Sequence, residues 1–314
     1  MPAPGPTAGA PLKRDSSATT ATLSTTPVHI VSPAYELYAP TREAAGTAQV
    51  ELDHAVSTFR RYFGTEPRAL GVVVFPSIEA MRSFDWTLLR ERGLRPLPWL
   101  VSLGESPRQG GTGIEGTRAL SHEACHLYLI GHTSHLLGRS ADRVAGAPRT
   151  YGDPSLPDWF DEGVATLCEF PVLQAQRIAH LAHVGDRTIP FVDLFRMEHP
   201  AFAGLMKVLE AQGAAMVPDS ASGGRTQVQV RQMRLPAGGI PGVDREQSLT
   251  FYAQAQSLLK FMAEREGPAF VGLLGEALAR GQSVEQVLAS HARNLPKNVP
   301  GFEREWKTWV AANR

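Results

Sequence analysis

Two imidazoles and a carboxylate fall within the pentapeptide His122-Glu123-Ala124-Cys125-His126, at a spacing that suits metal chemistry. Residues four apart lie on one face of an α-helix, so both histidines can bind one Zn²⁺ ion from the same side. Glu123 adjoins the first histidine and can take a proton from a water at the open position of that metal. In a chain with only 10 histidines among 314 residues, this pattern is expected by chance roughly 0.02 times.

The alternative is a solvent-exposed helix that carries two histidines by coincidence. The flanking sequence argues against it, because residues 116–121 offer a glycine break and then a helix start, and residues 127–130 are apolar or aromatic. A largely buried helix needs partners for two histidines and a glutamate, since burial of unpaired polar groups is costly. The sequence therefore favours a metal site.

A tetrahedral catalytic zinc needs a third protein ligand, with water in the fourth position. Glu162 is the best candidate, because the residues around it are mostly apolar and a buried glutamate is costly unless it is paired or binds a metal. Pro157 and Asp158 suit the start of a helix there. Gly163 would let another side chain or backbone approach closely. The alternative for Glu162 is a structural salt bridge.

The HEACH motif and the sequence Trp159-Phe160-Asp161-Glu162-Gly163-Val164-Ala165-Thr166 together resemble the gluzincin zinc metallopeptidases, and most closely small bacterial proteins of the peptidase MA-like group. The resemblance implies a zincin-like α+β fold and one Zn²⁺ ion held by His122, His126 and Glu162. It also implies hydrolysis of peptide bonds by activated water, with Glu123 as the general base.

A third motif extends the resemblance to residues 251–262, which are similar to a gluzincin helix that begins with a tyrosine. In that family the tyrosine hydroxyl points at the scissile carbonyl, so the resemblance implies that Tyr252 donates to the developing oxyanion. The alternative is a core tyrosine at the start of an amphipathic helix. The resemblance covers roughly residues 28–312, but only the three motifs are specific.

The sequence gives less information about the substrate than about the metal site. Aminopeptidases of this clan carry a G-x-M-E-N segment that holds the free amine of the substrate, and no such segment precedes His122. An endopeptidase acting on a peptide or protein is therefore favoured. Two alternatives stay open: a catalytically inactive zinc-binding module of the same fold, and a zinc hydrolase of a non-peptide bond. Other polar groups should orient the imidazoles, and the sequence does not choose among Asp161, Thr166 and Glu169.

Charge and hydropathy bear on partners and location. The formal net charge is zero, with 31 basic and 31 acidic residues, which gives no sign of a nucleic-acid partner. The longest apolar stretch, residues 70–75, is far too short to span a bilayer. Residues 1–26 lack the apolar core of a signal peptide but resemble the spacer that follows a removed signal, so an extracytoplasmic location is compatible with the sequence.

The two cysteines, Cys125 and Cys168, are too few for a disulfide framework. We interpret both as small buried apolar residues, and the alternative is a disulfide between the two motif-bearing helices. Two further histidine pairs have H-x-x-H spacing without a matching acid, namely His132/His135 and His180/His183. We interpret them as solvated rather than as a second metal site.

Composition and periodicity predict an α+β fold in three parts. These are a disordered segment (1–26), an α/β subdomain that carries the first two motifs (27–170), and a mainly helical subdomain (171–314). The resemblance to gluzincins implies that the second of these parts is zincin-like. Residues 131–156 are predicted to be an inserted loop, and residues 217–247 an edge strand or a loop overhanging the cleft.

The predicted strands are 29–31, 35–38, 71–75 and 99–103, the last as an edge that pairs with an extended substrate. The predicted helices are 42–63, 77–91, 172–183, 191–197, 202–212, 251–270, 282–292 and 302–312.

Overall fold

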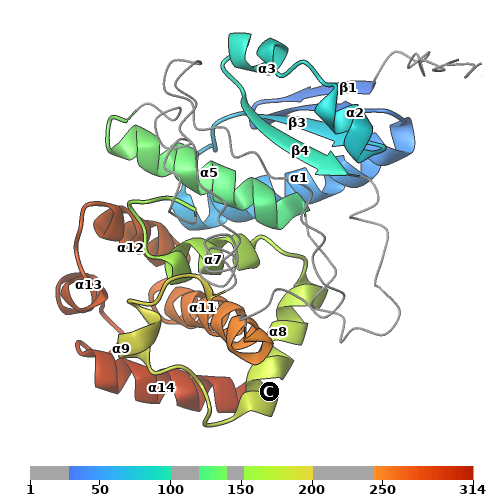
Figure 1. The fold of residues 1–314 in the computed structure, drawn as a ribbon. Helices are drawn as coiled ribbons and strands as arrows, with labels where there is room; N and C mark the ends of the chain where they lie inside the picture. The colour runs from blue at the N-terminus through green and yellow to red at the C-terminus, as the bar shows by residue number, and fades with distance from the viewer. Residues whose placement is uncertain (1–27, 101–119, 140–151, 201–243, 314) are drawn as a thin grey trace, which may run out of the picture.

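The computed structural model describes residues 28–100, 120–139, 152–200 and 244–313. It combines a small mixed β-sheet with many helices, so the fold is α+β. In Figure 1 the sheet lies at one end of the molecule and the C-terminal helices gather at the other. The predictions for residues 1–26, 202–212 and 217–243 lie outside the described residues.

The sheet contains β1 (Val28–Ser32), β2 (Tyr35–Ala39), β3 (Leu70–Phe75) and β4 (Arg95–Leu100), side by side in that order. β1 and β2 are antiparallel, whereas β2, β3 and β4 pair in parallel. β3 is buried along its whole length, as expected of a central strand in a parallel sheet. The first three strands were predicted from the sequence.

The fourth strand begins four residues earlier than the predicted range 99–103, and residues 101–103 lie outside the described part. Within that part β4 pairs with β3 alone. β4 therefore forms an edge of the sheet. Pro96 and Pro98 are tolerated there because an edge strand does not need N–H groups for hydrogen bonds to a second neighbouring strand.

Helix α1 (Arg42–Phe63) has the predicted bounds. The Thr41 hydroxyl caps its start by accepting from the N–H of Ala44. Gly64 ends it with a φ of 65°, in the left-handed region that favours glycine. The buried face of α1 packs on the sheet and on α5 (Leu120–Leu136), the helix that carries the HEACH motif (Figure 1).

The predicted loop 131–156 is wrong at its start, because α5 continues as a helix to Leu136. The Thr133 hydroxyl donates to the Leu129 carbonyl and to the Asp153 carboxylate. Gly131 is also buried on this turn. Tertiary contacts of the last turn therefore outweigh the weak helix propensity of glycine and threonine. Residues 140–151 of the predicted loop lie outside the described residues.

The second motif lies on α7 (Asp158–Leu167), which packs between α5 and α11 (Arg245–Glu266). A Cβ on Gly163 would lie 2.8 Å from the Cδ1 of Leu259 and 3.0 Å from the carbonyl oxygen of Ala255. This confirms that Gly163 allows a close approach, here of α11. The other helices of this half are α8 (Pro171–Val184), α9 (Phe191–Leu194), α12 (Ala269–Ala279), α13 (Val284–His291) and α14 (Val299–Ala312).

Three helix predictions are wrong in their extent. The helix predicted over 191–197 ends at Leu194. Residues 77–91 form two short helices, α2 (Ile78–Arg82) and α3 (Thr87–Glu91), because Phe84 and Trp86 between them pack on Phe75. The helix predicted over 251–270 ends at Glu266, since Gly267 has a φ of 94°. α12 then begins a new helix.

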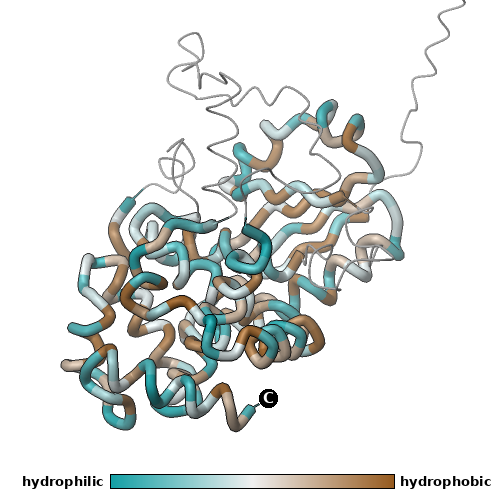
Figure 2. The backbone as a smooth tube through the Cα atoms, turned by 60° about the horizontal axis from the view of Figure 1, so that its bottom comes forward, coloured by the Kyte–Doolittle hydropathy of each residue, from teal (hydrophilic) through white to brown (hydrophobic). Residues whose placement is uncertain are grey.

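One cluster of buried apolar side chains runs from the sheet through α1, α5 and α7 to the C-terminal helices. Figure 2 shows strongly hydrophobic stretches along the strands, whereas the helices mix hydrophobic and hydrophilic segments. The two motif-bearing helices share this close-packed core, which fixes their relative position. Among the described residues no helix is both long and apolar enough to cross a membrane.

Candidate metal centre

α5 and α7 bring the three predicted ligands together. The Nε2 atoms of His122 and His126 lie 3.1 Å apart. Carboxylate oxygens of Glu162 lie 3.5 Å from the Nε2 of His122 and 3.8 Å from that of His126. Ligand atoms placed tetrahedrally about 2.0–2.1 Å from an ion lie about 3.4 Å from one another. The three side chains therefore form a group that can hold one metal ion.

Carboxylates hold the outer nitrogens of both imidazoles. The Nδ1 of His126 lies 2.7 Å from the Oδ1 of Asp161, and the Nδ1 of His122 lies 3.0 Å from the Oε1 of Glu169. An ionised carboxylate only accepts hydrogen bonds, so each Nδ1 carries the hydrogen and, in the neutral ring, each Nε2 presents a lone pair. Two lone pairs then face the Glu162 carboxylate, and this arrangement calls for a cation between them.

Among the three residues that the sequence left open as orienting groups, Asp161 and Glu169 contact an imidazole and Thr166 does not. The Thr166 hydroxyl donates to the backbone carbonyls of Glu162 and Gly163 within its own helix. Such back-bonding satisfies a buried threonine inside a helix. Only the tertiary structure separates these roles.

The charges at the centre are strongly coupled. Glu162 is fully buried, which raises the pKa of a carboxyl group, but the hydrogen bond from His199 and the charge of His126 lower the pKa of Glu162 to about 2. Burial lowers the pKa of His126, but the carboxylates of Asp161 and Glu162 raise it to about 10. The surroundings therefore favour positive charge at the centre, which either a proton or a metal ion can supply.

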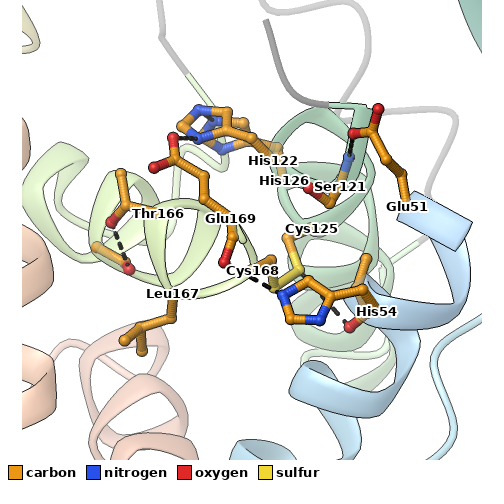
Figure 3. Close-up of a disulfide and its surroundings, with 12 residues drawn as sticks. Glu51, His54, Ser121, His122, Cys125, His126, Thr166, Leu167, Cys168 and Glu169 are labelled. Carbon is orange, nitrogen blue, oxygen red and sulfur yellow. Dashed lines mark hydrogen bonds and ion pairs between the residues drawn. A yellow bond between two sulfur atoms is a disulfide. The ribbon is translucent and has the colours of Figure 1, made fainter. Parts of the chain in front are cut away.

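Glu169 follows α7, and contacts of both its side chain and its backbone hold it in place. Figure 3 shows the contacts with His122 and His54. Its carboxylate accepts from the Nε of Arg177 at 2.7 Å. Its backbone carbonyl accepts from the Nε2 of Gln174 at 2.7 Å and faces the Nε2 of His54 at 3.2 Å. The orientation of His122 therefore depends on a carboxylate whose own position is fixed.

Asp161 is fixed by the segment that precedes α7. Its Oδ2 accepts from the backbone N–H of Asp153 at 2.9 Å. Gly152 has a φ of 58°, and a Cβ there would overlap the Oδ2 of Asp161. Gly152 is therefore required both by its backbone conformation and by the carboxylate that holds His126.

The interpretation of the cysteines as free apolar residues is wrong. Cys125 and Cys168 form a disulfide with a Cα–Cα distance of 6.4 Å. Figure 3 shows this bond between α5 and the end of α7, below the rings of His122 and His126. Both sulfurs are buried, as predicted, but sequence spacing gave no measure of the distance between two helices separated by an insertion. The alternative that we left open for the two cysteines is the one observed.

The structure adds His199, which the sequence analysis missed. Its Nε2 lies 3.1 Å from the Oε1 of Glu162 and 2.7 Å from the hydroxyl of Tyr252. Its backbone N–H donates to the Oδ2 of Asp158, at the start of α7, at 2.6 Å. His199 belongs to no motif, and it reaches the centre only through the path of the chain after α9, so no spacing rule identifies it.

Tyr252 and Glu123 both lie near this centre. Burial, followed by the charge of Glu162, raises the pKa of the Tyr252 hydroxyl well above its usual range, so this group stays protonated and can donate. Glu123 is half-buried on α5, and its negative charge acts on both His126 and Tyr252.

The additional histidine pairs do not form a second centre. The His132 ring packs edge-on against Phe59 and Phe63, so the interpretation of this residue as solvated is wrong. His180 contacts the Thr250 hydroxyl. Within the described part of the chain, His122, His126 and Glu162 form the one cluster of three or more His, Cys, Asp or Glu side chains that can hold a metal.

Comparisons with protein-family models, with curated proteins and with solved structures found no match to this chain.

Proposed function

We propose that this protein is a zinc-dependent metallopeptidase with a zincin-like fold. The observation that supports it best is the convergence of His122, His126 and Glu162 from two helices at the spacing of metal ligands. The carboxylates behind both imidazoles add to this support, because they favour the neutral tautomer in which each inner nitrogen presents a lone pair toward the other ligand atoms. Two imidazoles and one carboxylate suit zinc and leave the fourth position for water.

In the proposed hydrolysis the metal ligands, Glu123 and Tyr252 have different roles. His122, His126 and Glu162 would hold Zn²⁺, which when bound lowers the pKa of a water to about 7 and polarises a carbonyl. Glu123 would take the proton of the attacking water and pass it to the leaving amine. Tyr252 stays protonated beside the centre, so its hydroxyl can donate to the oxyanion of the transition state.

An endopeptidase is the favoured type, because the sequence lacks the segment that binds a free substrate amine in the aminopeptidases of this clan. β4 is an edge strand within the described part, and we propose that an extended substrate pairs with it. Pro96 and Pro98 limit the N–H groups that this edge offers. The pairing therefore relies on the remaining backbone groups of β4.

The buried disulfide supports an extracytoplasmic location, because disulfides form and persist mainly in oxidising compartments.

Metal content and turnover together test the function. The purified protein is analysed for bound metals and then incubated with casein, with a peptide library and with simple esters, with and without a chelator. We expect one equivalent of zinc and cleavage inside peptides that the chelator abolishes and added zinc restores. Zinc without cleavage would instead support a binding module, cleavage of esters alone a non-peptide hydrolase, and absence of any bound metal would refute the proposal.

A further inference from the structure

Arg177 is a buried cation that the sequence analysis did not single out. It lies on α8 and is 8% exposed. Its Nε donates to the Oε2 of Glu169 at 2.7 Å, and a second guanidinium nitrogen donates to the Oε1 of the same carboxylate. Burying an arginine is costly unless its donors are satisfied, and this two-point contact satisfies it.

The carboxylate that Arg177 holds is the one that orients His122. The Oε1 of Glu169 lies 3.0 Å from the Nδ1 of His122 as well as accepting from Arg177. A planar guanidinium that contacts both carboxylate oxygens fixes the plane of the carboxylate, which a single point charge does not. The direction of the inner nitrogen of His122 therefore depends on Arg177.

Arg177 also contacts Tyr252. The central carbon of its guanidinium group lies 5.0 Å from the centroid of the Tyr252 ring, within the range of a cation–π contact. The hydroxyl of the same tyrosine lies 2.7 Å from His199. Tyr252 is thus held at its ring by Arg177 and at its hydroxyl by His199.

We propose that Arg177 is a positioning residue that sets two parts of the centre at once, the direction of His122 as a metal ligand and the place of the Tyr252 hydroxyl. The first role requires only that the centre binds a metal. The second role rests on the proposed peptidase function. Arg177 would then fix the position of a metal ligand, His122, relative to the Tyr252 hydroxyl that donates to the oxyanion, without itself binding the metal or the substrate.

Metal affinity tests the first role. Arg177→Lys keeps the buried charge but loses the two-point contact, and Arg177→Gln loses both. The matched control is Arg187→Gln, which removes an exposed arginine paired with Glu246. Zinc affinity is measured by competition with a chelator, and the visible spectrum of the Co²⁺-loaded protein reports ligand geometry.

We expect Arg177→Lys to lower zinc affinity roughly 10- to 100-fold and to shift the Co²⁺ spectrum, with the control unchanged. In a Glu169→Gln background, Arg177→Lys should change the zinc affinity less than about twofold. The reason is that each of the two substitutions breaks the same contact, that between Arg177 and Glu169. Equal losses in the two backgrounds, or zinc affinity that stays at the wild-type value, would overturn the first role. Circular dichroism checks whether each variant is folded. If Arg177→Gln does not fold, Arg177→Lys alone serves as the test.

Kinetics of zinc-saturated protein test the second role. We expect Arg177→Lys to lower kcat about tenfold with little change in KM, because the tyrosine is misplaced in the transition state. Tyr252→Phe should then cost less in the Arg177→Lys background than in the wild type. Additive losses would overturn the second role. If the wild-type protein shows no turnover, the peptidase proposal and with it the second role fail, while the zinc measurements still decide the first.

Discussion

Cys125 and Cys168 form a disulfide, and each is the sequence neighbour of a residue at the metal centre, His126 in one case and Glu169 in the other. The bond joins α5, which carries two of the candidate ligands, to the end of α7, which carries the third. It therefore sets the distance between the two helices close to the ligands themselves. A covalent link at this place favours the close arrangement of the three candidate ligands whether or not a metal is bound.

Replacing Cys125 and Cys168 together by alanine should lower the free energy of unfolding of the metal-free protein by up to about 4 kcal/mol, because the bond closes a loop of 43 residues. Urea unfolding in the presence of a chelator measures this. A thiol reductant should bring the wild type to the level of the double variant and leave the double variant unchanged. Equal stability of wild type and variant would show that the disulfide does not constrain the chain.

Glu123→Gln should retain zinc and lose hydrolysis. The substitution keeps the shape of the side chain but removes the group that takes the proton, so kcat should fall by about 10²–10⁴-fold. Metal analysis tests whether zinc is retained, and a peptide-cleavage assay on the same preparation tests whether hydrolysis is lost. Glu305→Gln, on the exposed face of α14, is a matched control and should retain full activity. Normal turnover of the Glu123 variant would remove this residue from the mechanism.

Gly152→Ala should weaken both folding and metal binding. An alanine there adopts a strained backbone with a φ of 58°, and its Cβ displaces the Asp161 carboxylate from His126. Gly138→Ala is the control, because Gly138 has a φ of 61° with nothing within 4 Å of its Cβ position. We expect both variants to lose about 1 kcal/mol to strain. The Gly152 variant should also lose roughly tenfold in zinc affinity, and similar affinities in the two variants would contradict the role of Asp161.

Tyr252→Phe should lower kcat by about 10²–10³-fold, as expected for loss of one donor to an oxyanion. Zinc affinity should change little, because the hydroxyl contacts His199 rather than the proposed metal ligands. Steady-state kinetics and chelator competition measure the two effects. Tyr62→Phe on α1 removes a hydroxyl elsewhere and should leave kcat unaffected. A rise in KM with unchanged kcat would instead make Tyr252 a residue that binds substrate.

Glu36 makes the stability of the sheet depend on pH. Burial raises the pKa of its carboxyl group, but the contacts with Arg92, Tyr38 and His29 outweigh this and lower the pKa below its ordinary value of 4.5. A lowered pKa means that the ionised form stabilises the fold, so this contribution is present above about pH 4.5 and is lost as the pH falls. Glu36→Gln should therefore cost less than about 1 kcal/mol at pH 7, because Arg92 and His29 are partly exposed and solvent screens their attraction. At pH 3 the cost should be smaller, and urea unfolding at both pH values tests this.

The sequence predicted local elements best where local rules decide them. Helix α1 has the predicted bounds because Thr41 caps its start and Gly64 takes up a left-handed conformation at its end. The helix predicted over 77–91 failed because Phe84 and Trp86 gain more by packing on Phe75 than by continuing the helix. That gain depends on a strand pairing that sequence periodicity does not contain.

At the candidate site, too, some features follow from the local sequence and others depend on tertiary packing. The spacing of His122 and His126 follows from the helical repeat, and Glu162 was identified because a carboxylate in apolar surroundings needs a partner. Asp161, Glu169 and Thr166 were indistinguishable in sequence, yet only the two carboxylates face an imidazole. Their roles depend on the rotation of α7 against α5.

By itself, the sequence determined which side chains can carry metal chemistry and which helices present them, because both properties repeat over a few neighbouring residues. The tertiary structure alone decided the disulfide, the place of His199 beside Glu162 and the two contacts of Arg177. Each of these joins segments that lie far apart in the chain. Their distance is set by the packing of a shared core, and no local pattern of residues records that distance.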